Sequence, residues 1–466
     1  MCAMTSTKTL SEIWSEAEDV RRSYPHSFSD QIVADIYGNV EEITKQVLSK
    51  KGSKRYNFDQ RLDDIVTSKW FGYPLMLLLL VIVFWITMAG ANVPSRLLAT
   101  GFFAFQDQLT LWFQWIGAPT WVHGILVLGV YRTLAWVIAV MLPPMAIFFP
   151  LFTLLEDSGY LPRIAFNLDH IFKKAKACGK QSLTMCMGFG CNAAGVTACR
   201  IIDSPRERLI AILTNNFVPC NGRFPTLIVI STIFIGGVFV PYGGLVNALV
   251  ITVLILLGIA ATLLVSWLLS LTILKGEPSS LVLELPSYRR PQIGAVIYRS
   301  IIDRTLFVLR RAVIITAPAG AIIWILGNLH IGQQSILSTL GLVLNPFGQL
   351  FGLDGFIVMA FILGLAANEI VLPILLMSYL STGYIQDFAS LEGLRTILVS
   401  NGWTWLTAVN MMLFTLFHWP CSTTLLTTYK ETGSKKWVLI SFLIPTLTGL
   451  TLCFILTQGV RLLGLV

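Results

Sequence analysis

Long apolar stretches alternate with short polar segments along most of the chain. Seven stretches can cross about 30 Å of hydrocarbon as helices that rise about 1.5 Å per residue; they cover residues 70–91, 133–155, 209–235, 245–274, 312–329, 403–428 and 437–458. Residues 1–69 are polar, with apolar side chains at helical spacing, which predicts an amphipathic cytoplasmic helix. The pattern therefore predicts an all-α polytopic membrane protein with about seven transmembrane helices.

Two apolar segments are interrupted by glycine and polar residues. One lies within Met185–Pro225 and the other contains GLAANEIVLP at 364–373. Hydrocarbon offers no water to satisfy a broken backbone, so such segments must be surrounded by protein or by a wet cavity. We expect two re-entrant broken helices, at 181–199 and 356–378. The residues expected to interrupt the helices are Gly188, Gly190, Pro219, Asn221, Asn368 and Pro420.

The net charge of +8 follows membrane topology and does not indicate a nucleic-acid surface. With both broken segments re-entrant, 28 of the 33 Lys and Arg residues lie on the side of the N-terminus. Four others (Arg96, Arg132, Arg395 and Arg461) lie on the opposite side. Because Lys and Arg concentrate in cytoplasmic loops, we expect a cytoplasmic N-terminus and a multi-pass protein of the inner (plasma) membrane.

The order of elements repeats in the opposite orientation. Residues 133–274 read span, broken segment, span with VPCNGRFP, span; residues 312–466 read span, broken segment, span with WPCSTT, span. The first unit begins outside and the second inside, so the units are inverted. Interrupted segments at corresponding positions of inverted repeats indicate a transport site near the bilayer centre. An external, aromatic interfacial segment within residues 70–132 and a cytoplasmic loop at 275–311 complete the predicted organisation.

Metal-ligating side chains lie at these interruptions. Pro219-Cys220 and Pro420-Cys421 each combine a thiol with a proline, which frees a backbone carbonyl one turn earlier. Sulfur, carboxylate and imidazole together suit a divalent transition metal better than Mg²⁺ or Ca²⁺, which prefer oxygen. We predict a transported metal, with no stably bound cofactor, that contacts Cys191, Cys220, Cys421, Glu369 and His418.

Each of these residues also has a structural explanation. A cysteine in a span is commonly an apolar filler, the role we assign to Cys178, Cys186, Cys199 and Cys453. Glu369 could pair with Arg223, His418 could be an interior imidazole, and Asn192, Asn221 and Asn368 could cap the broken helices. An ionisable side chain at membrane depth costs about 2.5–3.5 kcal/mol on insertion scales, which favours a functional role for Glu369.

No motif indicates an enzyme. The eight Cys include no C-x-x-C pair, which predicts free thiols, and the five His form no H-E-x-x-H motif. Gly179-Lys180-Gln181-Ser182 is similar to the end of a phosphate-binding loop, but Lys174 stands where the leading glycine belongs. We therefore expect a transporter without a nucleotide site in this sequence.

Several segments together resemble the membrane region of FeoB-type ferrous iron transporters. LEDSGYLPRIAF, MGFGCNAAGVTACRIIDSPRERLIAILTNNFVPCNGRFP, GLAANEIVLP and LFHWPCSTTLLT follow the family's order over about residues 70–460. The resemblance implies two Gate regions and Fe²⁺ as the transported substrate. It also implies that the gate cysteines and second-gate glutamate of the family correspond to Cys191, Cys220, Cys421 and Glu369. Residues 1–69 resemble the end of the helical spacer that joins a cytosolic GTPase domain to the membrane region.

Two departures from the family pattern leave iron and other divalent metals open as substrates. The first gate continues as CNAAGVTA, without the usual early proline, and Asn368 replaces the usual lysine. The family's GTPase domain is not found in the sequence, so we expect a separate GTPase chain that docks on residues 1–69. Further expected partners are a small FeoA-like cytosolic protein and other copies of the chain. The alternatives are transport of a small organic, nucleoside-like solute and a non-transporting membrane scaffold.

Overall fold

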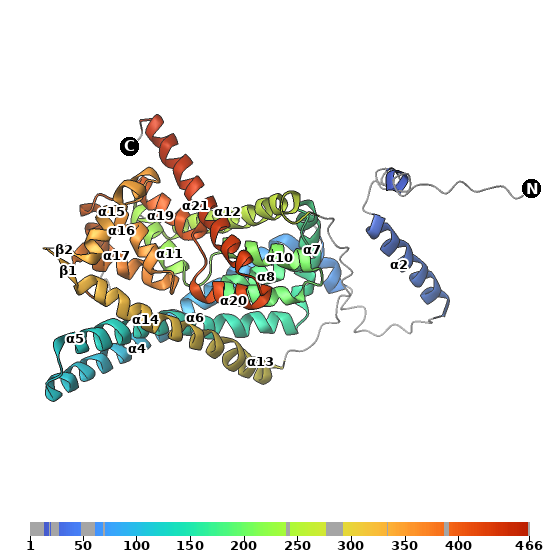
Figure 1. Ribbon diagram of the computed structural model, residues 1–466. Helices are drawn as coiled ribbons and strands as arrows, with labels where there is room; N and C mark the ends of the chain where they lie inside the picture. Colours follow the sequence, from blue (N-terminus) through green and yellow to red (C-terminus); the bar gives the residue numbers. More distant parts are fainter. Residues whose placement is uncertain are drawn as a thin grey trace, which may run out of the picture.

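The computed structural model describes residues 14–17, 19, 28–47, 61–68, 70–238, 243–275, 292–332, 334–385 and 391–464. Almost every element in these residues is helical (Figure 1). The exception is a short hairpin in which β1 (His330–Ile331) pairs antiparallel with β2 (Gln334–Ser335). The predicted all-α membrane fold is therefore confirmed. Most of the predicted cytoplasmic loop 275–311 before Gln292, and much of residues 1–69, lie outside the described residues.

Five helical runs in the described part of the chain are long and apolar enough to cross a membrane. They are α4 (Gly72–Ile116); α5 (Thr120–His123) with η1 (Gly124–Tyr131) and α6 (Arg132–Asp157); most of α12 (Gly243–Leu271); α13 (Ile293–Arg299) with η5 (Ser300–Leu306) and α14 (Phe307–Asn328); and α21 (Lys435–Leu462). A sixth span results if α15 (Ile336–Leu350) and α16 (Gly355–Leu363), which are bent by 109°, count as one. The other two predicted spans are divided into shorter helices.

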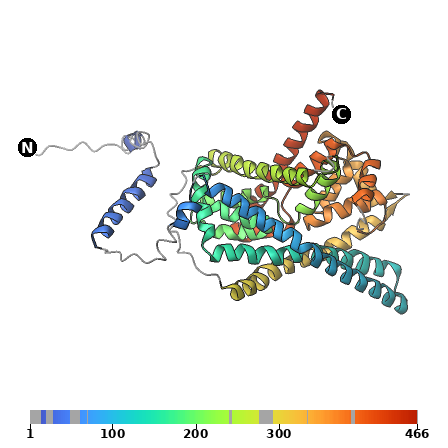
Figure 2. The ribbon, with the colours of Figure 1, turned by 180° about the vertical axis from the view of Figure 1, so that it is seen from behind.

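Helix α4 is longer than the predicted first span. Its 45 residues extend through Pro94, and a helix of this length measures about 68 Å. Gly117, with φ 69°, ends it, and the chain returns along α5 and η1. The interfacial segment predicted after residue 91 is thus a helical hairpin. Its far end projects beyond the neighbouring helices in both views (Figures 1 and 2).

Both segments predicted to be re-entrant consist of consecutive short helices. The first comprises α8 (Lys180–Gly190), α9 (Asn192–Ala198) and η2 (Cys199–Ile201). The second comprises α16, η6 (Asn368–Ile370) and α17 (Val371–Leu380). The divided spans are α10 (Pro205–Thr214) with η3 (Asn215–Phe217) and α11 (Phe224–Phe234), and α19 (Trp405–Phe417) with α20 (Ser422–Thr432). Phe149, Phe217, Phe361 and Phe414 are fully buried among these elements and form the centre of the apolar core.

The remaining helices lie outside this centre. They are α2 (Phe28–Val47), α7 (Tyr160–Lys174), α18 (Leu391–Ser400) and η4 (Gly236–Val238). Helix α2 has the predicted amphipathic pattern, and its apolar residues Ile36, Val40 and Ile43 are exposed. Residues 61–68 are anchored to α7 because the buried Arg163 binds Asp63 at 2.6 Å. The end of the N-terminal segment is thus attached to the helix that leads into α8.

Candidate functional site

One residue with extended backbone interrupts each broken helix. Cys191 has φ −157° and ψ 124° between α8 and α9, and Ala367 has φ −153° and ψ 129° before η6. The helix that follows each of them starts with N–H groups that have no partner within the helix itself, as helix N-termini do. The two interruptions therefore have the same local backbone geometry, although the sequences around them differ.

The prolines explain why two predicted spans are each divided. Between Phe217 and Phe224, and between Phe417 and Ser422, the chain leaves the helix at Pro219 and Pro420. Proline has no N–H to donate and disfavours helical geometry in the residue before it. Val218, directly before Pro219, accordingly has an extended ψ of 125°. His418 and Cys421, on either side of Trp419-Pro420, have extended ψ values of 173° and 159°. Each of these interruptions brings a cysteine, Cys220 or Cys421, into the interior.

The four interruptions meet around one cavity of about 30 Å³. This volume accommodates roughly one or two water molecules. Four of the predicted ligands contribute to its lining: Cys191, Cys220, Cys421 and Glu369. They come from four separate interruptions, so folding converts positions up to 230 residues apart (Cys191 and Cys421) into one group of thiols and a carboxylate.

Polar contacts fix the walls of the cavity. Asn368 Nδ2 donates to Cys220 Sγ at 3.7 Å, and Cys421 Sγ lies 3.3 Å from Thr424 Oγ1. The backbone N–H and the hydroxyl of Ser422 both donate to Leu365 O, at 2.8 Å and 2.9 Å. The carbonyl left free by the second broken helix is therefore held by the start of α20.

His418 lies beside the cavity and does not line it. Its Nδ1 is 2.8 Å from Thr415 O and 3.2 Å from Phe414 O, and its Nε2 is 3.2 Å from Asn368 Oδ1. Both ring nitrogens are thus engaged by the protein. In this geometry His418 orients Asn368, which in turn contacts Cys220.

Arg223 does not pair with Glu369 in the part of the chain that the structure describes. Its fully buried guanidinium donates to oxygens from both halves of the protein. The acceptors are Asn216 O (2.7 Å), Leu416 O (2.9 Å), Asn216 Oδ1 (3.1 Å), His418 O (3.1 Å) and Trp419 O (3.4 Å). Arg223 therefore satisfies carbonyls that the second Pro-Cys interruption frees. The Glu369 side chain remains at the cavity, and the residue is only 9% exposed.

Small residues are needed where the broken segments approach other groups. A Cβ at Gly222 would collide with Glu369 Oε1, and a Cβ at Gly190 would lie 2.6 Å from the Phe148 ring. Gly188 and Gly195 both pack against the side chain of Asn215. Asn215 Nδ2 in turn donates a hydrogen bond to Asn192 O at 3.0 Å. Asn221 lines a second, smaller cavity of about 10 Å³ that shares Met145 and Gly190 with the first.

The sequence analysis did not select two methionines that line the cavity. Met141 and Met145 lie on α6 on either side of Pro143-Pro144 and are buried. A methionine in an apolar span gives no compositional signal, since it is equally common as core filler. The one sequence feature that marks this part of the helix is the double proline Pro143-Pro144.

The described residues contain no group of three His, Cys, Asp or Glu side chains that could hold a metal ion. The three thiols and the carboxylate therefore share the cavity lining without forming a closed coordination shell. The lining also includes Asn368, Thr423 and Thr424, whose side chains carry amide and hydroxyl oxygens.

Comparison with protein families identifies the class. The Gate family, described as "Nucleoside recognition", matches residues 138–234 and again 309–435, so the interrupted helices of both halves belong to Gate domains. The family described as "Ferrous iron transport protein B C terminus" matches residues 251–303. The chain is a Gate-domain membrane protein and belongs to the FeoB family, where it corresponds to the membrane region.

Related proteins give the same assignment. An Fe(2+) transporter FeoB from Staphylococcus aureus (strain MSSA476) is 29% identical over 431 residues, which cover 90% of this chain and 62% of the relative. The corresponding proteins of Methanocaldococcus jannaschii and Campylobacter jejuni are 28% and 27% identical over 92% and 90% of the chain, and over 64% and 68% of their own lengths. The chain spans about three fifths of the length of the first of these relatives. No solved structure matches it.

Proposed function

We propose that this chain moves Fe²⁺ across the membrane into the cytoplasm through the cavity between the two Gate halves. The observation that supports this most strongly is the convergence of three thiols and one carboxylate where four interrupted helices meet. These ligands suit a borderline transition metal. The relatives described above are named Fe(2+) transporters, which makes iron the first candidate among such metals.

The incomplete shell fits an ion in transit. Conduction requires binding that is favourable enough for entry and weak enough for exit. Thiols, amide oxygens and the Glu369 carboxylate offer a dehydrating cation partial replacement of its water shell. Without a closed group of ligands, release on the far side does not require a tight complex to dissociate.

The size of the cavity weighs against an organic solute. Pockets for small organic ligands measure roughly 300–1,000 Å³. The cavity here measures about 30 Å³, which suits an ion and one or two waters but not a nucleoside. A metal of similar charge and size, such as Mn²⁺, remains the alternative substrate to compare.

Replacing the three cavity cysteines by serine is expected to reduce Fe²⁺ uptake by at least about tenfold, because each loses a soft ligand that harder oxygen does not replace. Uptake is measured anaerobically in proteoliposomes that contain a fluorescent iron chelator, with Mn²⁺ and a radiolabelled nucleoside in parallel. The control is Cys199→Ser with Cys453→Ser, two buried thiols away from the cavity. Unchanged uptake in the triple variant would refute the proposed path.

We also propose that the N-terminus lies in the cytoplasm and that a separate GTPase docks on residues 1–69. The exposed apolar stripe of α2 supports this, and Arg163 connects residues 61–68 to α7 and hence to the first broken helix. Changing Ile36, Val40 and Ile43 to Ser is expected to abolish co-purification of the GTPase from the native membrane and to remove any effect of GTP on iron uptake. If no GTPase co-purifies with the wild-type protein and uptake is indifferent to GTP, the partner does not exist.

A further inference from the structure

One face of α20 carries polar side chains from the cavity to the end of the helix. Cys421, Thr424, Thr428 and Glu431 are spaced by three, four and three residues. At 3.6 residues per turn, these four side chains lie within about 80° of one another around the helix axis. Cys421 and Thr424 line the cavity, and Glu431 lies in the last turn. The helix therefore provides a continuous polar edge through an otherwise apolar interior.

The middle of this edge is buried and incompletely satisfied. Thr424 and Thr428 are both buried, and Thr428 Oγ1 has no hydrogen-bond partner in the part of the chain that the structure describes. A buried hydroxyl without a partner costs free energy. It would gain a partner in a hydrated or partly dehydrated cation that moves along the helix.

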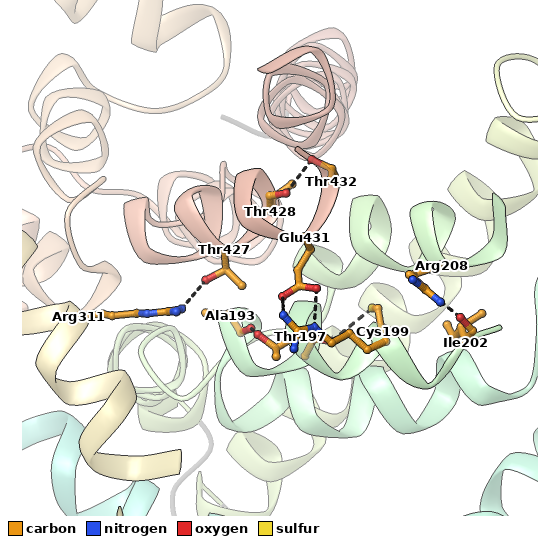
Figure 3. Close-up of polar contacts among 12 residues, drawn as sticks. Ala193, Thr197, Cys199, Ile202, Arg208, Arg311, Thr427, Thr428, Glu431 and Thr432 are labelled. Atoms are coloured by element: carbon orange, nitrogen blue, oxygen red, sulfur yellow. Dashed lines mark hydrogen bonds and ion pairs between the residues drawn. The ribbon is translucent and has the colours of Figure 1, made fainter. Parts of the chain in front are cut away.

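An ion pair closes the far end of the edge. Glu431 accepts hydrogen bonds from Nε and Nη2 of Arg200, each at 2.8 Å. The Glu431 side chain is 9% exposed, whereas that of Arg200 is 67% exposed. Figure 3 shows Glu431 directed from α20 toward the helices of the first Gate half, with Thr427 held on the other side by Arg311. The carboxylate is thus enclosed by protein, and an exposed guanidinium covers it from the solvent side.

The Arg200–Glu431 pair joins the two Gate halves. Its two residues lie about equally far along the chain from the cavity cysteines of their own halves. Helix α9 begins after Cys191 and leads through η2 to Arg200; α20 begins after Cys421 and leads to Glu431. At about 1.5 Å per residue, the pair lies on the order of 15 Å from the cavity cysteines. It borders the basic segments 200–208 and 429–436, which the distribution of charge assigns to the cytoplasm.

The first Gate half has a separate attachment on this face. An ion pair of Lys180 Nζ with Asp203 Oδ2, at 2.5 Å, lowers the pKa of this carboxyl. It ties the start of α8 to the segment after η2. Breaking the Arg200 contact therefore removes one link between the two Gate halves and leaves this second ion pair in place.

We propose that the ion leaves the cavity along the hydroxyl face of α20, between α20 and α9, and that Arg200 closes this route by occupying the Glu431 carboxylate. The proposal rests on the proposed transport of Fe²⁺. A guanidinium and a divalent cation compete for the same carboxylate, so the ion displaces Arg200 as it exits. Because an ion pair with one exposed partner contributes little free energy, the pair can open repeatedly.

Accessibility of position 428 tests the route without depending on iron transport. Thr428→Cys is labelled by a membrane-impermeant maleimide from the cytoplasmic face, and the modified peptide is quantified by mass spectrometry. Adding Arg200→Gln is expected to raise the labelling rate about fivefold, the change in open population that the loss of one exposed ion pair produces. Arg200→Lys retains the charge but cannot form both hydrogen bonds, so its labelling rate is expected to lie between those of Arg200 and Arg200→Gln. Equal rates for Arg200 and Arg200→Gln would overturn the proposal.

Transport measurements separate this proposal from the proposed function. In proteoliposomes, Arg200→Gln is expected to accelerate Fe²⁺ release, whereas Glu431→Gln, which removes the carboxylate as well as the pair, is expected to slow it relative to Arg200→Gln. If wild-type uptake requires the cavity cysteines but both variants match the wild type, the exit route is wrong and the cavity assignment stands. If the wild-type protein moves no iron while Arg200→Gln still exposes position 428, the closure by Arg200 stands and the transport of iron is wrong.

Discussion

Replacing Glu369 by Gln is expected to lower Fe²⁺ uptake at least about tenfold while the protein still folds. Glu369 supplies the one carboxylate in the cavity lining, and a neutral amide of the same shape cannot compensate a divalent charge away from bulk water. A tenfold loss corresponds to about 1.4 kcal/mol of ion stabilisation. Initial uptake rates in proteoliposomes measure the effect, and size-exclusion chromatography in detergent confirms that the variant is folded.

Gly222 provides an independent test of the same carboxylate. A Cβ at this position would collide with Glu369 Oε1, so Gly222→Ala is expected to displace the side chain and reduce uptake without removing its charge. Gly459→Ala is the matched control, because a Cβ there meets no neighbouring atom within 4 Å. Wild-type uptake by Glu369→Gln would show that the carboxylate does not contact the ion.

Replacing Arg223 by Leu is expected to produce the largest loss of stability. The substitution removes the guanidinium that satisfies carbonyls of Asn216, Leu416 and Trp419. His418 O keeps a hydrogen bond from Asn216 Nδ2 at 2.8 Å. Each buried carbonyl left unpaired costs about 1–3 kcal/mol. The sum is a large fraction of the roughly 5–15 kcal/mol that stabilises a folded protein.

The measurement is thermal denaturation in detergent followed by size-exclusion chromatography. A decrease of about 10 °C or more in the melting temperature is expected for Arg223→Leu. Arg223→Lys keeps the charge but lacks the planar fork, so it is expected to recover only part of the loss. Full recovery with lysine would mean that charge alone matters and that the hydrogen bonds between the Gate halves do not.

The cavity residues could be predicted from sequence where a polar or ionisable residue lies within an otherwise apolar segment. Cys191, Cys220 and Cys421 directly follow a Gly or Pro, and Glu369 lies between Gly364 and Pro373. The interruptions at these positions bring all four residues to one cavity. His418 and Arg223 followed the same pattern but do not line the cavity, and most of their hydrogen bonds go to backbone carbonyls. Polarity identified the interior position of these two residues but not the direction of their side chains, because that depends on carbonyls from a distant part of the chain.

Other features had no local signal. Met141 and Met145 look like ordinary core residues, and only the helix geometry of α6 brings them to the cavity. The extension of α4 beyond residue 91 was missed because aromatic residues near polar ones are also typical of an interfacial segment. The pairing of Arg200 with Glu431 connects residues 231 positions apart and requires the two Gate halves to be placed together.

The central claim is that the transported ion passes between Cys191, Cys220, Cys421 and Glu369. Crystals soaked anaerobically with Fe²⁺ and measured at the iron absorption edge test it most directly. We expect an anomalous difference peak inside the cavity, within bonding distance of the thiols or the carboxylate, that is absent in the triple serine variant. A peak elsewhere in the membrane interior, with the cavity free of iron, would contradict the account.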